Sequence, residues 1–155
     1  MARVPESVAQ FLRGKRFAVA GVSRASGQAA NAVYHRLKDC GYEVFPINPN
    51  ASEVEGVTAY PDLAAIPVTV DGVVIATHPD ISLDIVRQCS QHGVKRVWFH
   101  RSFGGGSVSP QAVRECEERG LHCIVGGCPL MFCGQVDFGH KCMRWWLQRA
   151  GRVPR

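Results

Sequence analysis

The stretch FAVAGVSRASG, residues 17–27, decides the fold prediction. A short apolar strand runs directly into a loop bounded by two glycines, and a helical pattern follows at once. In parallel α/β proteins this junction holds nucleotide phosphates, because the backbone N–H groups and the dipole of the following helix favour negative charge. Gly21 lets the chain turn tightly, while Ser23, Arg24 and Ser26 can donate further hydrogen bonds. We therefore predict a phosphate-binding loop here.

The spacing of Gly21 and Gly27 excludes the common nucleotide motifs. A P-loop requires G-x-x-x-x-G-K-[ST], whereas five residues separate these glycines and Gln28 follows them. The dinucleotide motif G-x-G-x-x-G is also absent, because Ser23 stands at the second glycine position. The next apolar run ends in INPN, residues 47–50, without the carboxylate that binds the ribose of NAD. The pattern favours a nucleotide held through its phosphates and argues against NAD.

Length and composition favour a single domain over residues 1–155. Hydrophobic residues make up 46% of the chain, which is enough for a substantial core. No apolar run is long enough to span a bilayer and the N-terminal stretch lacks the apolar core of a signal peptide, so we expect a cytoplasmic protein without membrane contact. The net charge of +5 comes from dispersed basic residues without interleaved stacking aromatics, so we expect no nucleic-acid binding.

Seven cysteines are scattered through the chain. An odd number, spread over the predicted helices and strands, indicates reduced and mostly buried thiols and not a disulfide framework. Cysteine and histidine gather near the C-terminus in the spacing C-x4-C-x6-H-x-C, which matches no zinc pattern. We therefore predict no metal site.

Five continuous apolar runs alternate with amphipathic segments. Runs without polar alternation are typical of strands in a sheet that helices cover on both faces. A glycine precedes three of the runs, where it can end a helix in the left-handed conformation. We predict a Rossmann-like, doubly wound α/β fold with a mostly parallel five-stranded sheet and helices on both faces. The expected strands are 16–20, 42–47, 71–76, 94–99 and 121–125, and the expected helices are 5–13, 28–40, 80–92, 109–119 and 138–150.

Ligands of such sheets bind at the carboxyl ends of the strands, near the point where the strand order reverses. In this chain those ends are rich in Gly, Pro, His, Arg and Ser, although the apolar runs before them are almost free of polar groups. Turn residues occur in the loops of any such fold, so it is the set of loops that indicates a ligand site at that edge. Between the second and third strands we expect only a turn and a single helical turn near Asp62–Ile66.

Several short motifs occur in the order and spacing of a known family. They are GVSR at 21–24, FPINPN at 45–50, AYPDLAAIP at 59–67, VVIATHP at 73–79 and GGCPLMF at 126–132. Residues 10–135 thereby resemble the CoA-binding domain family, small stand-alone bacterial proteins similar to the N-terminal domain of the succinyl-CoA synthetase alpha subunit. The segment DFGHKCMRWW, residues 137–146, looks like an extension found in one branch of that family.

The resemblance implies where coenzyme A would lie. The implied contacts are Gly21, Val22, Ser23 and Arg24 for the phosphates, Asn48, Pro49 and Asn50 for the adenosine, and Thr77, His78 and Pro79 for the adenine or diphosphate. Family members often carry lysine where Asn50 stands, and Arg101 is the candidate replacement for that cation. The pantetheine arm would run towards Cys128, whose thiol could form a mixed disulfide with CoA under oxidation. His78, just before a proline, also suits a helix-capping turn.

The hypothesis from these observations is a protein that binds CoA or an acyl-CoA without a catalytic centre of its own. In the related synthetase the phosphorylated histidine and the nucleotide-grasp subunit lie outside the CoA-binding domain, and this sequence offers no acid–base pair. Two alternatives stay open. One is a small NADP-dependent or other nucleotide-using oxidoreductase, because Arg24 suits an additional phosphate; the other is a thiol-based redox-responsive protein. The sequence also leaves open a homodimer or another protein partner.

Overall fold

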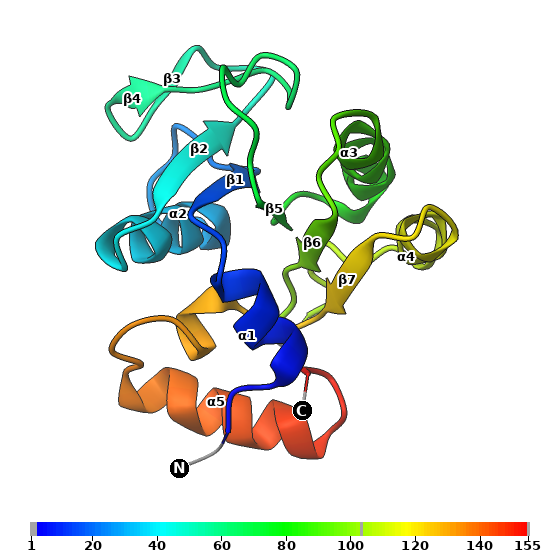
Figure 1. Cartoon of the computed structure of the whole chain (residues 1–155). Coiled ribbons are helices and arrows are strands. Elements are labelled where there is room, and N and C mark those ends of the chain that lie inside the picture. Colours follow the sequence, from blue (N-terminus) through cyan, green and yellow to red (C-terminus); the bar gives the residue numbers. More distant parts are fainter. Residues whose placement is uncertain (1–2, 103, 155) are drawn as a thin grey trace.

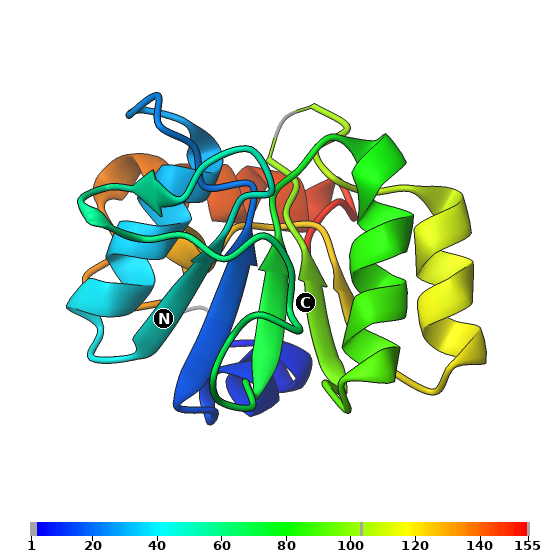
Figure 2. The same cartoon turned by 90° about the horizontal axis from the view of Figure 1, so that it is seen from above.

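Five parallel strands form one sheet in the order β2-β1-β5-β6-β7 (Figure 1). The computed structural model describes residues 3–102 and 104–154. The strands are β1 (Arg16–Ala20), β2 (Glu43–Ile47), β5 (Gly72–Ile75), β6 (Arg96–Phe99) and β7 (His122–Val125). Their arrows point towards the same edge of the sheet (Figure 2). The chain turns from β1 to β2 on one side and continues with β5 on the other, so the strand order reverses between β1 and β5.

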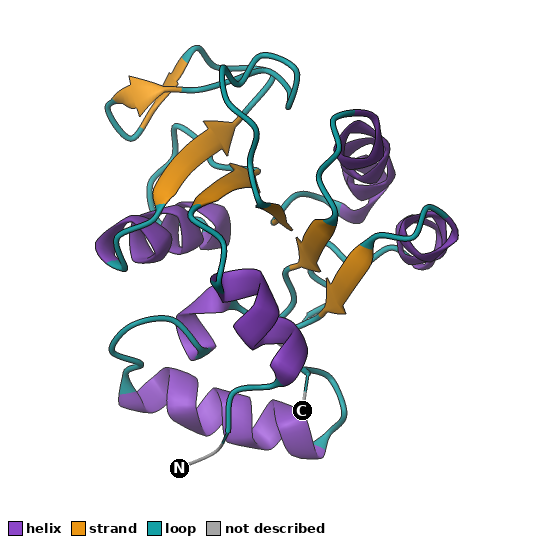
Figure 3. Cartoon of the chain, in the orientation of Figure 1, coloured by secondary structure: helices purple, strands orange, loops and turns teal. Residues whose placement is uncertain are grey.

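Helices cover both faces of this sheet (Figure 3). The helices are α1 (Glu6–Leu12), α2 (Ala29–Asp39), α3 (Pro79–Gln91), α4 (Pro110–Glu118), the short 3-10 helix η1 (Pro129–Met131) and α5 (Phe138–Arg149). Phe17 and Val19 pack with α1, α2 and η1, with α5 beyond them, whereas Ala18 and Ala20 face α3 and α4. Because alternate strand residues are buried on opposite faces, the strands are continuous apolar runs. The predicted fold class is confirmed, and the boundaries of the five predicted strands of this sheet and of the five predicted helices lie within two residues of the observed ones.

The segment between β2 and β5 differs from the prediction. It forms a hairpin of two antiparallel strands, β3 (Glu53–Val54) and β4 (Val57–Thr58). Both turn residues have positive φ, +50° at Glu55 and +73° at Gly56, as a type I′ hairpin turn requires. Asparagine or aspartate is the usual first residue of that turn, so the pair Glu-Gly was a weak signal.

The prediction of a helical turn near Asp62–Ile66 is wrong. These residues form a hydrogen-bonded turn in which the Asp62 carboxylate accepts from the N–H of Ala65 at 2.9 Å. Prolines at 61 and 67 bracket the segment and leave too few residues between them for a stable helix.

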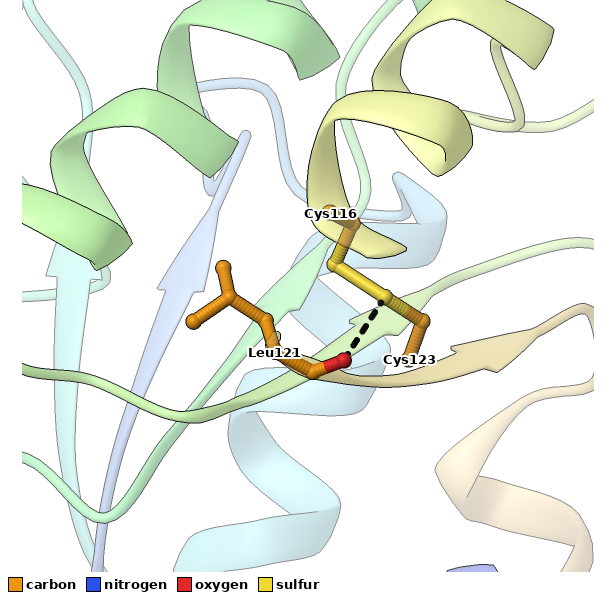
Figure 4. Close-up of a disulfide and its surroundings, with 3 residues drawn as sticks. All are labelled: Cys116, Leu121 and Cys123. Atoms are coloured by element: carbon orange, nitrogen blue, oxygen red, sulfur yellow. Dashed lines mark hydrogen bonds between the residues drawn. A yellow bond between two sulfur atoms is a disulfide. The ribbon is translucent and has the colours of Figure 1, made fainter. Parts of the chain in front are cut away.

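One pair of cysteines contradicts the prediction that all seven thiols are reduced. Cys116 of α4 and Cys123 of β7 form a disulfide, with their Cα atoms 6.6 Å apart (Figure 4). The Sγ of Cys123 also lies 3.6 Å from the carbonyl oxygen of Leu121. The chain reverses direction at Gly120 between helix and strand, so the two sulfurs come together although the spacing follows no redox or metal motif. The free cysteines are Cys40, Cys89, Cys128, Cys133 and Cys142.

Neither a membrane-spanning helix nor a metal-binding cluster occurs among the described residues. None of the described helices combines the length and the apolar character needed to cross a membrane. Within residues 3–102 and 104–154, no three side chains of His, Cys, Asp or Glu gather as a metal ion would require.

Candidate functional site

The loop after β1 begins where three strand ends meet. Gly21 has a φ of +103°, and its N–H donates to the carbonyl oxygen of Ile47 at the end of β2 at 3.2 Å. A Cβ atom at this position would collide with the carbonyl oxygen of Ala76, the residue after β5. Glycine is therefore required both for its conformation and for its lack of a side chain. The loop thus starts at the point of strand-order reversal, where ligands of such sheets bind.

A buried asparagine fixes the shape of this loop. The Asn31 side chain, only 2% exposed, accepts from the N–H of Ser23 at 3.0 Å and donates to the Ser23 carbonyl at 2.8 Å. A side-chain amide that pairs with both backbone groups of one residue replaces a strand partner for that residue. The loop is consequently held by the helix that follows it.

The end of β2 holds the other side of the loop. The Asn48 amide donates to the carbonyl oxygen of Val22 at 2.9 Å, and its own oxygen accepts from the N–H of Asn50 at 2.8 Å. Asn48 is half-buried, whereas Pro49 and Asn50 are exposed. The structure thus brings the predicted residues of the two loops into direct contact, with Asn48 as the residue that joins them.

The hairpin contacts α2 at the residue that holds the loop. The carboxylate of Glu55 accepts from the amide of Asn31 and lies 2.9 Å from His35 Nε2. The hydrogen bonds from Asn31 and His35 hold the pKa of Glu55 below its ordinary value. Neither Asn31 nor Glu55 was predicted as a site residue from the sequence. The only sign of Asn31 in the sequence was its position as a polar residue beside the apolar face of the predicted helix 28–40.

The N-terminus of α2 has no side-chain cap. In α3, α4 and α5 a side chain of His78, Ser109 or Asp137 accepts a hydrogen bond from the first turn. At α2 the preceding residue is Gln28, whose side chain makes no such bond, and Pro5 before α1 makes none either. The first N–H groups of an α-helix lack partners within the helix and carry its positive dipole end. The glycine loop therefore leads into a helix start that is suited to an anion.

The middle of the loop is open to solvent. Arg24, Ser26 and Gly27 are exposed, and a Cβ atom added to Gly27 would meet no atom within 4 Å. The Ser23 hydroxyl accepts from the N–H of Ala25 at 3.0 Å and so stabilises the turn before these residues. The predicted guanidinium and hydroxyl donors are thus accessible beside the start of α2.

The residues after β5 lie next to Gly21. Thr77 contacts the position that a Cβ of Gly21 would occupy, and its Oγ1 is buried without a hydrogen-bond partner among the described residues. His78 is largely exposed and caps α3 through Nδ1, which lies 3.5 Å from the N–H of Asp80. Pro79 is the first residue of α3. The structure therefore gives His78 the capping role, while Thr77 is positioned near the glycine loop.

Of the other two predicted residues, Arg101 lies beneath the C-terminal segment 152–154, and Cys128 follows two glycines that pack against this segment. The guanidinium of Arg101 donates to the carbonyl oxygen of Arg152 at 3.1 Å, and burial together with Arg152 lowers its pKa. Cys128 is only 4% exposed, and burial raises its pKa to about 11. A Cβ atom at Gly126 would collide with the carbonyl oxygen of Arg152. Arg101 is thus covered by the chain itself, and Cys128 is buried near it, after two glycines that the same segment covers.

Comparison with known proteins gives a family match over most of the chain. A family model described as "CoA binding domain" matches residues 15–133. The protein YneT of Bacillus subtilis (strain 168) is 27% identical over 116 residues, which are 75% of this chain and 83% of YneT. The ADP-forming acetate–CoA ligase II of Archaeoglobus fulgidus is 34% identical over 83 residues, which are 52% of this chain. The match spans 12% of that ligase, so the chain corresponds to a small part of it.

Solved structures share the same fold. The crystal structure of Prb, the PH1109 protein redesigned for binding, has a TM-score of 0.73 and 31% identity and covers 79% of this chain and 84% of its own. A hypothetical protein from Pyrococcus horikoshii OT3 has a TM-score of 0.72 and 27% identity, with coverage of 83% and 92%.

Proposed function

The chain belongs to the CoA-binding domain family, and we propose that it binds coenzyme A or an acyl-CoA with the phosphates at the loop after β1. The observation that carries this proposal is the uncapped start of α2 beside an open glycine loop. Backbone N–H groups at such a helix start bind phosphate oxygens, and the helix dipole favours their charge. Arg24 supplies a planar donor that suits a phosphate in two parallel hydrogen bonds.

The remaining contacts follow from the position of the phosphates. Asn31 and Asn48 hold the loop in shape through the hydrogen bonds to Ser23 and Val22, and are positioning residues in this proposal. Thr77 offers a buried hydroxyl without a partner among the described residues, and a ligand oxygen or nitrogen would satisfy it. Pro49 and Asn50 are exposed beside the loop and are proposed to border the adenosine.

The proposal gives the chain no reaction of its own. Among the histidines near the site, His78 caps α3, His35 is paired with Glu55, and His100 is buried, with a pKa lowered by that burial. Acetyl-CoA incubated with the protein is therefore expected to stay intact. Hydrolysis or transfer of the acetyl group that depends on the protein would contradict this part of the proposal.

Titration calorimetry with CoA, acetyl-CoA, NAD and NADP tests the proposal. We expect binding of the two CoA compounds, and a loss of roughly tenfold or more in affinity for Arg24→Ala, since a hydrogen bond to a charged group contributes about 1.5–3 kcal/mol. Arg13→Ala is the matched control, because Arg13 is an exposed arginine at the opposite edge of the sheet. Its affinity should equal that of the unchanged protein. Binding of NADP but not of CoA would overturn the proposal in favour of the oxidoreductase. A CoA affinity that Arg24→Ala leaves unchanged would overturn the proposed phosphate site.

A further inference from the structure

Two free cysteines meet at the edge of the sheet opposite the glycine loop. Cys40 follows the last residue of α2, just before β2 begins, and Cys133 comes two residues after η1. They are 93 positions apart in the sequence. Both line the same cleft, and the thiol of Cys40 contributes to the raised pKa of Cys133. The fold therefore builds a dithiol from two segments that no sequence motif connects.

An arginine holds the two segments against each other. The guanidinium of Arg36 donates to the carbonyl oxygen of Cys133 at 3.1 Å and to that of Gln135 at 2.9 Å. Between them, a Cβ atom placed on Gly134 would lie 2.9 Å from the Cys40 sulfur. The backbone after Cys133 thus passes directly over Cys40, and Arg36 fixes it there.

The dithiol lies in a cleft that is open to solvent. The cleft has a volume of about 660 Å³, and both cysteines line it together with Tyr42, Phe132 and Arg36. Cys40 is half-buried, whereas Cys133 is only 4% exposed. A small molecule that enters the cleft therefore reaches the sulfur of Cys40 first.

We propose that this cleft is a thiol–disulfide exchange site that takes a low-molecular-weight disulfide, with Cys40 as the attacking and Cys133 as the resolving cysteine. In the first step the Cys40 thiolate attacks one sulfur of the small disulfide, forms a mixed disulfide and releases the other half as a thiolate. In the second step the Cys133 thiolate attacks the Cys40 sulfur and expels the remaining half. Two protein thiols and one small disulfide give one protein disulfide and two small thiols, so the protein is oxidised and the small disulfide reduced.

The surroundings of Cys133 act on its thiolate in two opposite directions. Burial and the Cys40 thiol raise the pKa of Cys133 to about 12, while the charge of Arg36 acts in the opposite direction. Once Cys40 is part of a mixed disulfide, its sulfur carries neither a proton nor a charge, so its coulombic contribution to the raised pKa is removed. Because both cysteines line one cleft and the Cys40 sulfur lies against Gly134, the residue after Cys133, the second step needs no diffusive encounter.

Incubation of the full chain with oxidised glutathione, followed by mass spectrometry of tryptic peptides without reductant, tests the proposal. We expect the peptide of residues 39–87 to be linked to that of residues 120–141, which already carries residues 115–119 through the disulfide of Cys116 and Cys123, with no glutathione left on Cys40. Cys133→Ser should trap glutathione on Cys40, whereas in Cys40→Ser the buried Cys133 should stay unmodified. Where serine impairs folding, Cys133→Ala keeps the site apolar and has the same expected result.

Two controls decide whether the link belongs to this pair. Cys128→Ser removes an equally buried thiol from the same tryptic peptide and should leave the link in place. The exposed Cys142 reports that oxidised glutathione reacts under the conditions used. Glutathione that stays on Cys40 of the unchanged protein, or an unmodified Cys40 beside a modified Cys142, would overturn the proposal. The assay contains no CoA, so its outcome is independent of the proposed ligand.

Discussion

The loops after β1 and β7 begin with the same backbone conformation but differ in their exposure to solvent. Each has a glycine with positive φ directly after a strand, +103° at Gly21 and +87° at Gly126, and each lies at the carboxyl edge of the sheet. The loop after β1 is exposed at its middle and leads into the uncapped start of α2. At the loop after β7, Gly126 is buried against the carbonyl oxygen of Arg152, and Val153 is only 5% exposed.

The difference shows what a glycine loop by itself indicates. Local sequence determines the backbone conformation, since positive φ and close approach both require glycine. Access to a ligand depends on what else packs there, and at Gly126 that is a segment 26 residues further along the chain. The first loop is therefore the better candidate for phosphates, and the second is part of the core.

The largest expected effect is that of Gly21→Ala. The new Cβ would collide with the backbone at Ala76 and the residue would keep an unfavourable φ, so we expect a loss of roughly 3–5 kcal/mol in the free energy of unfolding. Gly27→Ala is the matched control, with a φ of +91° but open space around it, and should cost about 1–2 kcal/mol. Urea unfolding measures both. Equal losses would show that the close approach to β5 does not matter.

A second variant breaks the loop from the helix side. Asn31→Ala leaves the N–H and carbonyl of Ser23 without their partner, which should lower the free energy of unfolding by roughly 1–3 kcal/mol. Asn50→Ala removes an exposed amide and should be nearly neutral. Amide hydrogen exchange at Ser23 should also accelerate in Asn31→Ala. Unchanged exchange there would remove Asn31 from its positioning role.

A third variant tests the comparison by displacing the segment 152–154 from the loop after β7. Val153→Asp places an unpaired carboxylate in the core and should displace the segment 152–154. Labelling of Cys128 by a thiol reagent should then be faster by roughly tenfold or more, because opening becomes easier by more than about 1.4 kcal/mol. Val153→Thr, similar in size and uncharged, is the control and should change the rate far less. If both variants label at the rate of the unchanged protein, the segment is not what protects Cys128.

The smallest expected effect concerns pH. His100 follows β6 and is 8% exposed, and burial lowers its pKa below the ordinary 6.5. Below pH 6.5 the unfolded chain binds a proton that the folded one does not, so stability is full above that pH and falls as the pH decreases. The titration of His100 changes the free energy of unfolding by at most about 1.4 kcal/mol per pH unit. His100→Gln should have a flatter stability profile between pH 5 and 7 than the unchanged protein. Parallel profiles would contradict a buried neutral imidazole.

Much of the fold was predictable because its signals are local. Continuous apolar runs predicted the five strands, and Gly41, Gly93 and Gly120 have the positive φ expected of glycines that end helices. The glycine loop after β1 was likewise found from its neighbours in the sequence. These features depend on residues a few positions apart, which a single sequence displays directly.

Other features depend on contacts between distant residues. Asn31 and Glu55 lie 24 positions apart, and their pairing depends on a hairpin turn with unusual residues. The cover over Gly126 and the disulfide of Cys116 with Cys123 follow from where helices and strands pack, which no local pattern indicates. Sequence alone therefore predicted which loops lie at the carboxyl edge of the sheet but not which of these loops is open.

The most direct test follows the backbone amide resonances of both loops by NMR while CoA is added. We expect the backbone amide resonances of residues 22–31, from the glycine loop into the first turn of α2, to shift, and those of residues 126–128 to change far less. Shifts confined to residues 126–128, or a saturating titration that leaves residues 22–31 unchanged, would contradict the central claim that the uncapped helix start holds the phosphates.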